Sequence, residues 1–338
     1  MGSCGVDYLA SVAAFPKPDE KLRTDRLEVQ GGGNAANALT AAARLGLQPL
    51  LVSKIGGDGL GDSILEELEG EGIDTSQVLR AAGSPSPFTY IIVDRQGGTR
   101  TCIHTPGEAF APEEVTEQLR QHSLQDARLV YFDGRLTEAA LLLAAAARAA
   151  GVPVLVEAER LRPGLDQLLQ LADCVVTSAT FPQAWTGEPL LSDALLASAQ
   201  RLPRARFLLT TLGSAGSVML VPQPDGAVGS STGNRAGRAN DDDVRAHPCT
   251  AVPCASVRVG VLADHRVECV TPALQDAVVD TTGAGDAFIG SVLYALAHGL
   301  PLPKMMQLAS LVAASKCTQL GARPGLPHCS SIAPDLLS

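Results

Sequence analysis

The sequence lacks the features that mark membrane, secreted or zinc-binding proteins. No apolar stretch reaches the ~18 residues that a membrane-spanning helix needs. The start, MGSCGVDYLA, has neither the basic stretch nor the apolar run of a signal peptide. The eight cysteines form no CxxC pair. We therefore expect a cytoplasmic protein with reduced thiols, without a disulfide framework or a zinc site.

Basic residues are also scarce. The 338-residue chain has 26 lysines and arginines against 36 aspartates and glutamates, which gives a net charge of −10. Such a chain repels nucleic acid and anionic lipid, so we expect neither as a partner. Aromatic residues make up only 4% of the chain, which weakly disfavours a site that stacks a nucleobase. The 46% of hydrophobic residues suffices for the core of one large domain or two smaller ones.

What is present is an alternation of strand-like and helix-like stretches. Apolar runs at 48–56 and 127–134 predict buried strands, and the segments 60–72 and 137–151 predict helices that end at glycine. Further short apolar strands follow at VPVLVEAE, ADCVVTSA and ARFLLTTLG. Strands that alternate with helices predict an α/β fold, in which a mostly parallel central sheet is flanked by helices.

Three segments depart from this alternation. Residues 6–30 and 86–105 have the pattern of β-hairpins and predict a small antiparallel sheet beside the main body. Residues 222–256 are rich in Gly, Pro, Ser, Ala and Asp, and predict a flexible insertion. The acidic run at 241–243 fits a solvated loop better than a metal site.

The first chemistry-bearing motif is GGGNAANALTAAARLG (31–46), where three glycines lead into a helix. Asn34 and Asn37 are one helical turn apart, so both amides can face the same small polar molecule. The glycines allow close approach of the backbone. The alternative is that Asn34 caps the helix and Asn37 is solvated. The motif is not a dinucleotide fingerprint, because the GxGxxG spacing fails.

The second motif is VVDTTGAGDAF (278–288), in which a strand-like run ends at Asp280 and a glycine turn becomes a helix. The turn Gly283–Gly285 leaves bare N–H groups at a helix start, an anion hole suited to a transferring phosphoryl group. Asp286, in the first helical turn, can accept a proton from an attacking hydroxyl. The alternative is a capping aspartate after a plain glycine turn. This is not a Walker A loop, since GK[ST] is absent.

The pair GGGNAANA and DTTGAGDAF, in this order, resembles the ribokinase-like (PfkB-type) family of small-molecule kinases. Supporting stretches extend over nearly the whole chain, namely GSCGVD, SKIGGDGLGDSILEELEGEGIDTSQV, LLTTLGSAGSV and KCTQLGARPGLP. Within the family, GGNAAN (32–37) and VLVEAER (154–160) are similar to the ketohexokinase branch. That similarity favours a ketose or related sugar over a nucleoside.

The resemblance implies a single kinase domain over residues 1–338, built as a ribokinase-like three-layer sandwich with a small β-sheet lid. The lid would come from about residues 8–30 and 85–106, with the flexible insertion at about 222–256. ATP and Mg²⁺ are implied as cofactors, and commonly K⁺ as a stimulating ion. A homodimer that pairs through the lid edges is compatible with this fold.

The resemblance also assigns roles to residues by position. Substrate hydroxyls would be bound by Asp7, Gly33, Asn34 and Asn37. Arg100, on the second lid arm, would either reach substrate or phosphate or remain an exposed charge. The anion hole would be Gly283, Ala284 and Gly285, with Asp286 as the base. The nucleotide site would include Thr211, Gly213, Gly216 and Thr282. A monovalent cation would be held by Asp280, Thr282 and the backbone near Gly321.

The chain departs from the family pattern in two places. The Asn-x-x-Glu motif that assists Mg²⁺ is missing, because TSATFPQAW has no acid at that spacing. Glu157 and Glu159 are either its substitutes as metal-binding residues or an ordinary charged strand end. Only Met1 precedes GSCGVD, so we expect either a shortened first strand or an incomplete start, which would affect how Asp7 is positioned.

The sequence thus predicts ATP-dependent phosphorylation of a small sugar hydroxyl, with a ketose or pentose as the acceptor. One alternative is a nucleoside kinase of the same family. Another is a kinase-like scaffold with weakened catalysis, an alternative that the two departures leave open. The intact Asp286 and anion hole argue against a scaffold, because a scaffold needs no carboxylate there.

Overall fold

The computed structural model describes residues 1–338 except 98, 224–256, 264 and 271–277. Nearly all of the predicted insertion, with its acidic run, therefore lies outside the described residues. The strands are β1 (Gly5–Val12), β2 (Arg26–Gly32), β3 (Leu50–Gly56), β4 (Asp74–Ala81), β5 (Phe88–Asp94), β6 (Thr99–Thr105), β7 (Val130–Phe132), β8 (Val154–Ala158), β9 (Cys174–Thr177), β10 (Leu208–Thr211), β11 (Ser217–Pro222), β12 (Val257–Leu262) and β13 (His265–Val270). The α-helices are α1 (Asn34–Arg44), α2 (Gly59–Gly70), α3 (Glu117–Leu124), α4 (Thr137–Ala149), α5 (Leu165–Leu169), α6 (Phe181–Thr186), α7 (Leu191–Gln200), α9 (Ala284–His298), α10 (Leu302–Lys316) and α11 (Pro334–Leu337).

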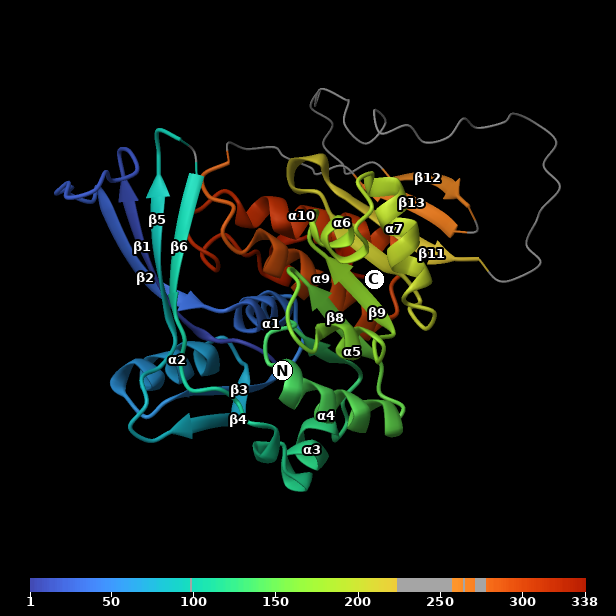
Figure 1. Cartoon of the computed structure of the whole chain (residues 1–338), viewed down its shortest axis with the longest axis horizontal. Helices are drawn as coiled ribbons and strands as arrows, with labels where there is room; N and C mark the ends of the chain where they lie inside the picture. Colours follow the sequence, from blue (N-terminus) through green and yellow to red (C-terminus); the bar gives the residue numbers. More distant parts are fainter. Residues whose placement is uncertain (98, 224–256, 264, 271–277) are drawn as a thin grey trace.

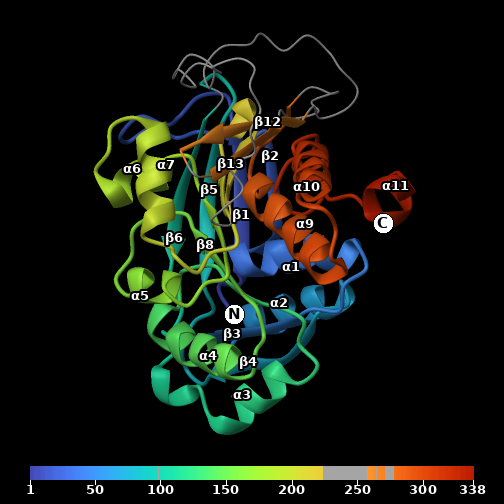
Figure 2. The same cartoon turned by 90° about the vertical axis from the view of Figure 1, so that its right-hand side faces the viewer.

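A seven-stranded sheet with the order β12-β13-β11-β10-β9-β8-β7 forms the centre of the molecule. Strands β7 to β10 run parallel, whereas β11, β12 and β13 pair antiparallel at one side. In Figure 2, α9 and α10 lie on one side of this sheet and α6 and α7 on the other. These three layers confirm the predicted α/β fold with a mostly parallel sheet.

The two cores on either side of the sheet follow from the alternation of side chains along each strand. Every residue of β8 is buried. Leu155 joins the core that contains residues of α1, α9 and α10. Its neighbours Val154 and Val156 point the other way, into the core that contains residues of α4 and α5. A strand covered on both faces is mostly apolar, which is why VPVLV reads as a continuous apolar run and why the buried Glu157 that follows it stands out.

A four-stranded sheet with the order β2-β1-β5-β6 stands beside this body, at the left of Figure 1. Both predicted hairpins pair as expected, β1 antiparallel to β2 and β5 antiparallel to β6. The inner strands β1 and β5 run parallel to each other. We call this the projecting sheet. Whether it works as a lid stays a prediction.

The first residues of the chain lie between two other strands. The Met1 amino group donates to the Tyr131 carbonyl of β7 at 2.7 Å, and Gly2 N donates to the Val52 carbonyl of β3 at 3.1 Å. Strand β3 pairs with β4 in a separate two-stranded sheet. The short segment before β1 thus links that pair to the seven-stranded sheet.

One local prediction is wrong. Residues 278–280, which precede the glycine turn, form no strand. Their backbone is bonded to the end of α10 instead, because the N–H groups of Val279 and Asp280 both donate to the Cys317 carbonyl, at 2.8 and 3.2 Å. Val278 and Val279 are about half exposed, so their apolar side chains do not mark a buried strand.

No helix among the described residues is long and apolar enough to cross a bilayer.

Candidate active site

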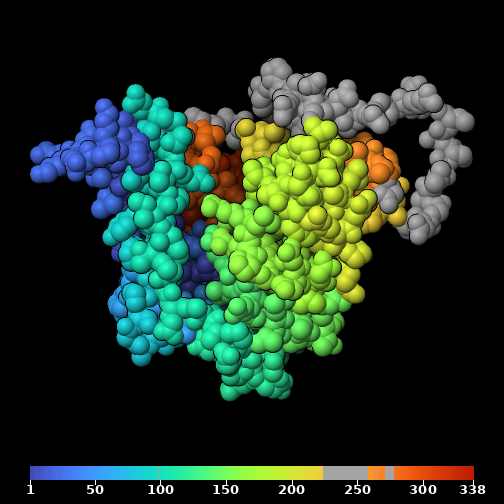
Figure 3. Space-filling view, in the orientation of Figure 1, coloured from blue at the N-terminus to red at the C-terminus, as the bar shows by residue number. Residues whose placement is uncertain are grey.

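Most of the predicted site residues gather at one edge of the seven-stranded sheet. The carboxyl ends of β7, β8 and β10 lead into Asp133, Glu159 and Leu212, respectively. In open α/β sheets this edge is where ligands bind. Figure 3 shows a cleft between the projecting sheet and the main body, with atoms from both ends of the chain, coloured dark blue and dark red, inside it.

Asp286 lies in the first turn of α9 and is 8% exposed. Asn37 Nδ2, from α1, donates to Asp286 Oδ2 at 2.8 Å. The two helices approach closely because Gly290 has no side chain, and a Cβ there would lie 2.5 Å from the Ala38 carbonyl oxygen. The structure thus brings together the two motifs that the sequence placed about 250 residues apart.

Burial raises the pKa of the Asp286 carboxyl to about 7. The hydrogen bond from Asn37 opposes this rise, as does the charge of Arg135, whereas the charges of Glu159 and Asp7 add to it. A carboxyl with a pKa close to neutral can exchange a proton near pH 7, which is what a general base requires.

The turn before Asp286 has a backbone that only glycine adopts easily. Gly283 has φ +76°, and a Cβ there would lie 2.7 Å from the Cβ of Ala322. Four residues later in the chain, Ala287 N donates to the Gly283 carbonyl at 2.8 Å, a regular backbone hydrogen bond at the start of α9. The N–H groups of the first helical turn have no acceptor within the helix and favour an anion.

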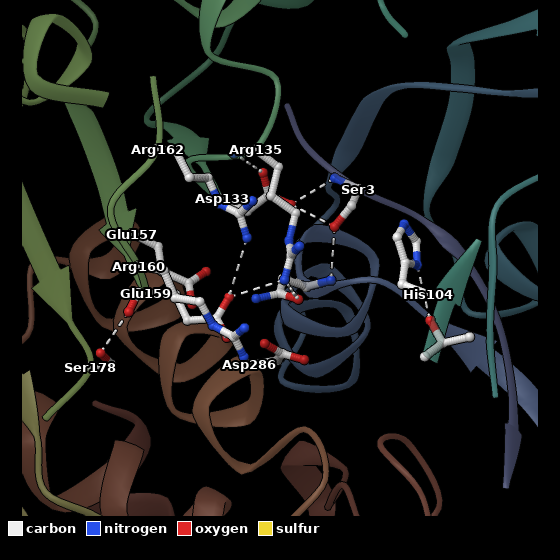
Figure 4. Close-up of polar contacts among 12 residues, drawn as sticks. Ser3, His104, Asp133, Arg135, Glu157, Glu159, Arg160, Arg162, Ser178 and Asp286 are labelled. Carbon is white, nitrogen blue, oxygen red and sulfur yellow. Dashed lines mark hydrogen bonds and ion pairs between the residues drawn. The ribbon is translucent and has the colours of Figure 1, made fainter. Parts of the chain in front are cut away.

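Carboxylates crowd the ends of β7 and β8, as Figure 4 shows. Tyr131 Oη donates to Glu157 Oε2 at 2.6 Å, and Asp133 accepts both the backbone N–H and the hydroxyl of Ser3 at 2.7 Å. Burial and the neighbouring Asp286 charge raise the pKa of Glu157 well above its usual range. Negative charge is therefore in excess at this edge of the sheet.

Arg135, which the sequence analysis did not single out, partly balances that charge. Its Nη2 donates to Asn34 Oδ1 at 3.1 Å and to Glu159 Oε2 at 3.0 Å. Its Nε is buried without a hydrogen-bond partner in the described part of the chain. The available signal was its place two residues after Asp133, at the end of a buried strand. In Figure 4 its side chain points to the centre of the cluster.

The predicted substrate residues of the first motif are held in fixed positions. Gly33 has φ +90°, and a Cβ there would lie 2.6 Å from the Cα of Cys4. Asn34 N donates to Ser3 Oγ at 3.0 Å, so the start of α1 is tied to the first residues of the chain. Asp7 lies directly against Gly32, where a Cβ would come within 2.4 Å of its carboxyl. Burial raises the pKa of Asp7 to about 6.

Arg323 is a second residue that the sequence analysis missed. It is 4% exposed, and its Nε donates to Asn37 Oδ1 at 3.1 Å while Nη1 donates to Glu67 at 2.8 Å. Asn37 therefore connects a buried arginine to Asp286. The closing stretch KCTQLGARPGLP was recognised, but nothing local marks its arginine as a partner of α1.

Arg100 crosses from the projecting sheet to the glycine turn. It comes from β6, and its Nη1 donates to Thr281 Oγ1 at 2.5 Å. This contact joins the two sides of the cleft next to the predicted anion hole. The role of Arg100 in binding substrate or phosphate stays a prediction.

We expect Arg100→Ala to loosen this contact and to let water compete for the phosphoryl group. An exposed charge-assisted contact is worth up to ~1 kcal/mol, so the acceptor KM should rise about two- to fivefold. The ratio of phosphorylated product to ADP should fall below one, as measured by coupled assay and mass spectrometry. Arg26→Ala is the matched control, because Arg26 lies in the same sheet and pairs with Glu28, two residues away in β2. Unchanged KM and coupling would contradict a closing role.

Three of the four predicted nucleotide residues, Thr211, Gly213 and Gly216, lie at a tight turn two strands away from β8, whereas Thr282 lies in the turn before α9. Thr211 ends β10 and its hydroxyl donates to the Thr177 carbonyl of β9 at 3.3 Å. Leu212 N donates to the Gly216 carbonyl at 2.7 Å. Gly213 and Gly216 both have positive φ, at 60° and 93°. This turn and the Glu157 cluster lie along the same edge of the sheet.

The residues predicted to hold a monovalent cation are bonded to one another. Asp280 Oδ1 accepts the N–H and the hydroxyl of Thr282 at 3.0 and 2.8 Å. Asp280 Oδ2 accepts Gly321 N at 2.7 Å. The Asp280 carbonyl accepts Lys316 Nζ at 2.7 Å. Lys316 was not among the predicted site residues.

Mg²⁺ would fit the acidic edge of the sheet. Within the described residues, no group of three or more His, Cys, Asp or Glu side chains could form a metal cage. Mg²⁺ at phosphate sites usually takes only one or two carboxylates and completes its shell with phosphates and water. Burial, and then the charge of Asp286, raise the pKa of Glu157, and a divalent cation bound beside its carboxyl would favour the ionised form.

Comparison with known proteins decides the family. The model for the pfkB family of carbohydrate kinases matches residues 1–233 and 259–329. The chain belongs to this family. The kinase is 24% identical over 331 residues to a ribokinase of Haemophilus influenzae, covering 97% of this chain and 94% of that protein. It is 23% identical over 325 residues to mouse ketohexokinase, covering 94% of each.

Solved structures confirm the ribokinase-like fold of the kinase. A structure of Arabidopsis thaliana ribokinase complexed with ribose and ATP matches with a TM-score of 0.74. It covers 100% of this chain and 97% of that chain at 21% identity, so it establishes the fold alone. Nucleoside kinases are also among the similar proteins. The predicted recognition of the family is confirmed, and the acceptor stays open.

Proposed function

We propose that the kinase transfers the γ-phosphoryl group of ATP to a hydroxyl of a small sugar, a ketose or a pentose. The observation that carries this proposal is Asp286, a buried carboxyl with a pKa of about 7 directly after the glycine turn at the start of α9. It lies in the same cleft as Asn34 and Asp7, whose polar side chains suit the hydroxyls of a sugar.

In the proposed reaction, Asp286 accepts the proton of the attacking hydroxyl. The N–H groups of Gly283–Gly285 stabilise the charge on the transferred group. Asn37 orients the base through its 2.8 Å hydrogen bond, and Arg135 fixes Asn34 for the substrate. The projecting sheet acts as a lid that excludes water during transfer.

ATP would lie along the sheet edge between Thr211 and Thr282, with the turn at Gly213 and Gly216 leaving room for the nucleotide. The ATP complex of a protein with the same fold supports this choice of donor. Glu157 would hold Mg²⁺, which neutralises phosphate charge when bound. We also place the enzyme in the cytoplasm, where its six described cysteines would remain the free thiols that the structure shows.

The test is ADP release with MgATP across fructose, ribose, other ketoses and several nucleosides, with Asp286→Asn as the control. Turnover on one sugar that the mutant loses would support the proposal and name the substrate. Turnover on a nucleoside alone would keep the mechanism and overturn the acceptor. A folded protein that binds ATP but turns over nothing would favour the scaffold alternative.

We also propose that two copies of the kinase form a homodimer through the outer faces of their projecting sheets. Register places Val29, Tyr8, Tyr90 and Ile103 in one row across the four strands. Val29, Tyr90 and Ile103 are 56%, 50% and 54% exposed. A contiguous apolar row on an exposed sheet face suits a second copy of the same face.

We expect Ile103→Glu to weaken this dimer by at least ~10-fold in Kd, because a buried unpaired charge opposes association. Sedimentation equilibrium measures the change. Val261→Glu is the control, because Val261 lies in β12 of the other sheet and is 67% exposed, and it should leave association unchanged. A wild-type protein that stays monomeric at micromolar concentration would overturn the dimer.

A further inference from the structure

Lys316 is an ammonium group buried beside the glycine turn. It is the last residue of α10 and is 0% exposed. Its Nζ donates to the Asp280 carbonyl at 2.7 Å and to the Gln319 carbonyl at 3.2 Å. Burying an ammonium is costly, so such a residue needs oxygen ligands and a nearby negative charge.

Both requirements are met by the segment that leads into the anion hole. The Asp280 side chain is 7% exposed, and its carboxylate oxygens are taken by Thr282 and by Gly321 N. Lys316 therefore bonds to the backbone oxygen of Asp280 and not to its carboxylate. Carbonyl oxygens with a carboxylate close by form the surroundings that suit a dehydrated monovalent cation.

A simpler account is that Lys316 only satisfies the end of its own helix, as basic residues often do. The contact with Gln319 fits that account. The shorter contact does not, because Asp280 lies 36 residues away in sequence and opens the glycine turn. The N–H groups of Val279 and Asp280 also bond to the Cys317 carbonyl, so the end of α10 holds this segment from two directions.

The residues expected to bind K⁺ therefore do not fit a dissociable ion. The Asp280 carbonyl, one of the oxygens that this set offers, already accepts an ammonium of the chain itself. We propose that Lys316 replaces the monovalent cation, so that the turn before Asp286 is held in its anion-binding shape without K⁺. This inference rests on the proposed phosphoryl transfer for its activity readout alone.

The first experiment uses the wild-type enzyme. Turnover and Tm are measured in KCl and in choline chloride at equal ionic strength. We expect both to be the same in the two salts. A several-fold stimulation by K⁺, or a Tm that rises specifically with K⁺, would overturn the proposal. The Tm comparison decides even if no acceptor is phosphorylated, which separates failure of this inference from failure of the proposed function.

Two variants of the same lysine test the replacement directly. Lys316→Ala removes the ammonium and leaves space, so turnover in choline should fall about 10- to 100-fold, the cost of leaving these oxygens without their partner. KCl or NH₄Cl should restore most of the activity and raise the Tm. Lys316→Met fills the space with an apolar chain and should lose activity without rescue by either salt.

Lys304→Ala is the matched control, since Lys304 lies on the same helix and its Nζ donates to the Ser338 carbonyl, away from the glycine turn. It should behave as wild type in both salts. A folded Lys316→Ala enzyme that stays fully active in choline, or that neither cation rescues, would overturn the proposal. If Lys316→Ala folds only in K⁺, that result supports it, and if it folds in neither salt the wild-type comparison decides.

Discussion

Replacing Asp286 by asparagine is expected to lower kcat by about 10²–10⁴, the usual contribution of a general base. The substitution keeps size and shape, so the Asn37 contact and the glycine turn should persist. ATP affinity should change little, because the predicted nucleotide residues Thr211, Gly213 and Gly216 belong to β10 and the turn after it, whereas Asp286 lies in α9. Rapid-quench and ATP-binding measurements check both statements. Turnover close to wild type would remove Asp286 from the mechanism.

The pH dependence of kcat/KM should report the ionisation of Asp286. The base acts only when ionised, and its pKa is about 7. Wild-type kcat/KM should therefore rise tenfold per pH unit below 7 and level off above it. The residual activity of Asp286→Asn should be flat across that range.

The contribution of Asp286 to the free energy of unfolding should instead fall as the pH rises. The folded pKa of about 7 is raised from the ordinary value of 3.8, so the folded state holds this proton more tightly than the unfolded state does. Stability from this group is complete below pH 3.8 and declines as the pH rises to about 7. Above that pH, Asp286→Asn should be more stable than wild type by the order of a few kcal/mol.

Asp62→Asn provides the matched control for both measurements. Asp62 also lies in the first helical turn, of α2, but its side chain is 64% exposed and pairs with Arg80. The loss of an exposed ion pair should change stability by less than ~1 kcal/mol and leave kcat unchanged. If Asp62→Asn altered kcat as much as Asp286→Asn, general effects of lost charge would explain the result.

Gly283→Ala is expected to have the second largest effect. Its φ of +76° is strained for alanine, and the new Cβ would lie 2.7 Å from the Cβ of Ala322. The turn must move by several tenths of an ångström, which misdirects the N–H groups of the anion hole. Loss of such donors lowers kcat by about 10²–10³. The strain should also lower the free energy of unfolding by about 1–3 kcal/mol.

Gly299→Ala separates strain from displacement. Gly299 caps the other end of α9 with φ +70°, and a Cβ there meets nothing within 4 Å. It should lower stability by ~1 kcal/mol and leave kcat unchanged. Denaturant unfolding and steady-state kinetics measure both quantities. Wild-type kcat in a folded Gly283→Ala enzyme would mean that the turn does not bind the transferred group.

Local patterns were enough for much of the fold. The apolar run of β8 and the glycine-ended helices α2 and α4 follow from side-chain period and helix-stop signals, which act over a few residues. The same logic failed at residues 278–280, where two valines suggested a strand. Their backbone bonds to Cys317, at the end of a helix that lies later in the sequence, and no local pattern reports that partner.

The family, the fold class and the two glycine motifs could be predicted from the sequence, because each signal is a short local pattern even where the patterns lie far apart in the chain. Three sets of contacts became visible only in the folded chain: Asn37 bonds to Asp286, Arg135 and Arg323 bond to the two asparagines, and Lys316 reaches the Asp280 carbonyl. Long charged side chains carry no periodic signal, and their partners are chosen by which strand ends and helix ends meet in space. Burial of the carboxyls of Asp286 and Glu157 in the folded chain then raises the pKa values on which the proposed chemistry depends.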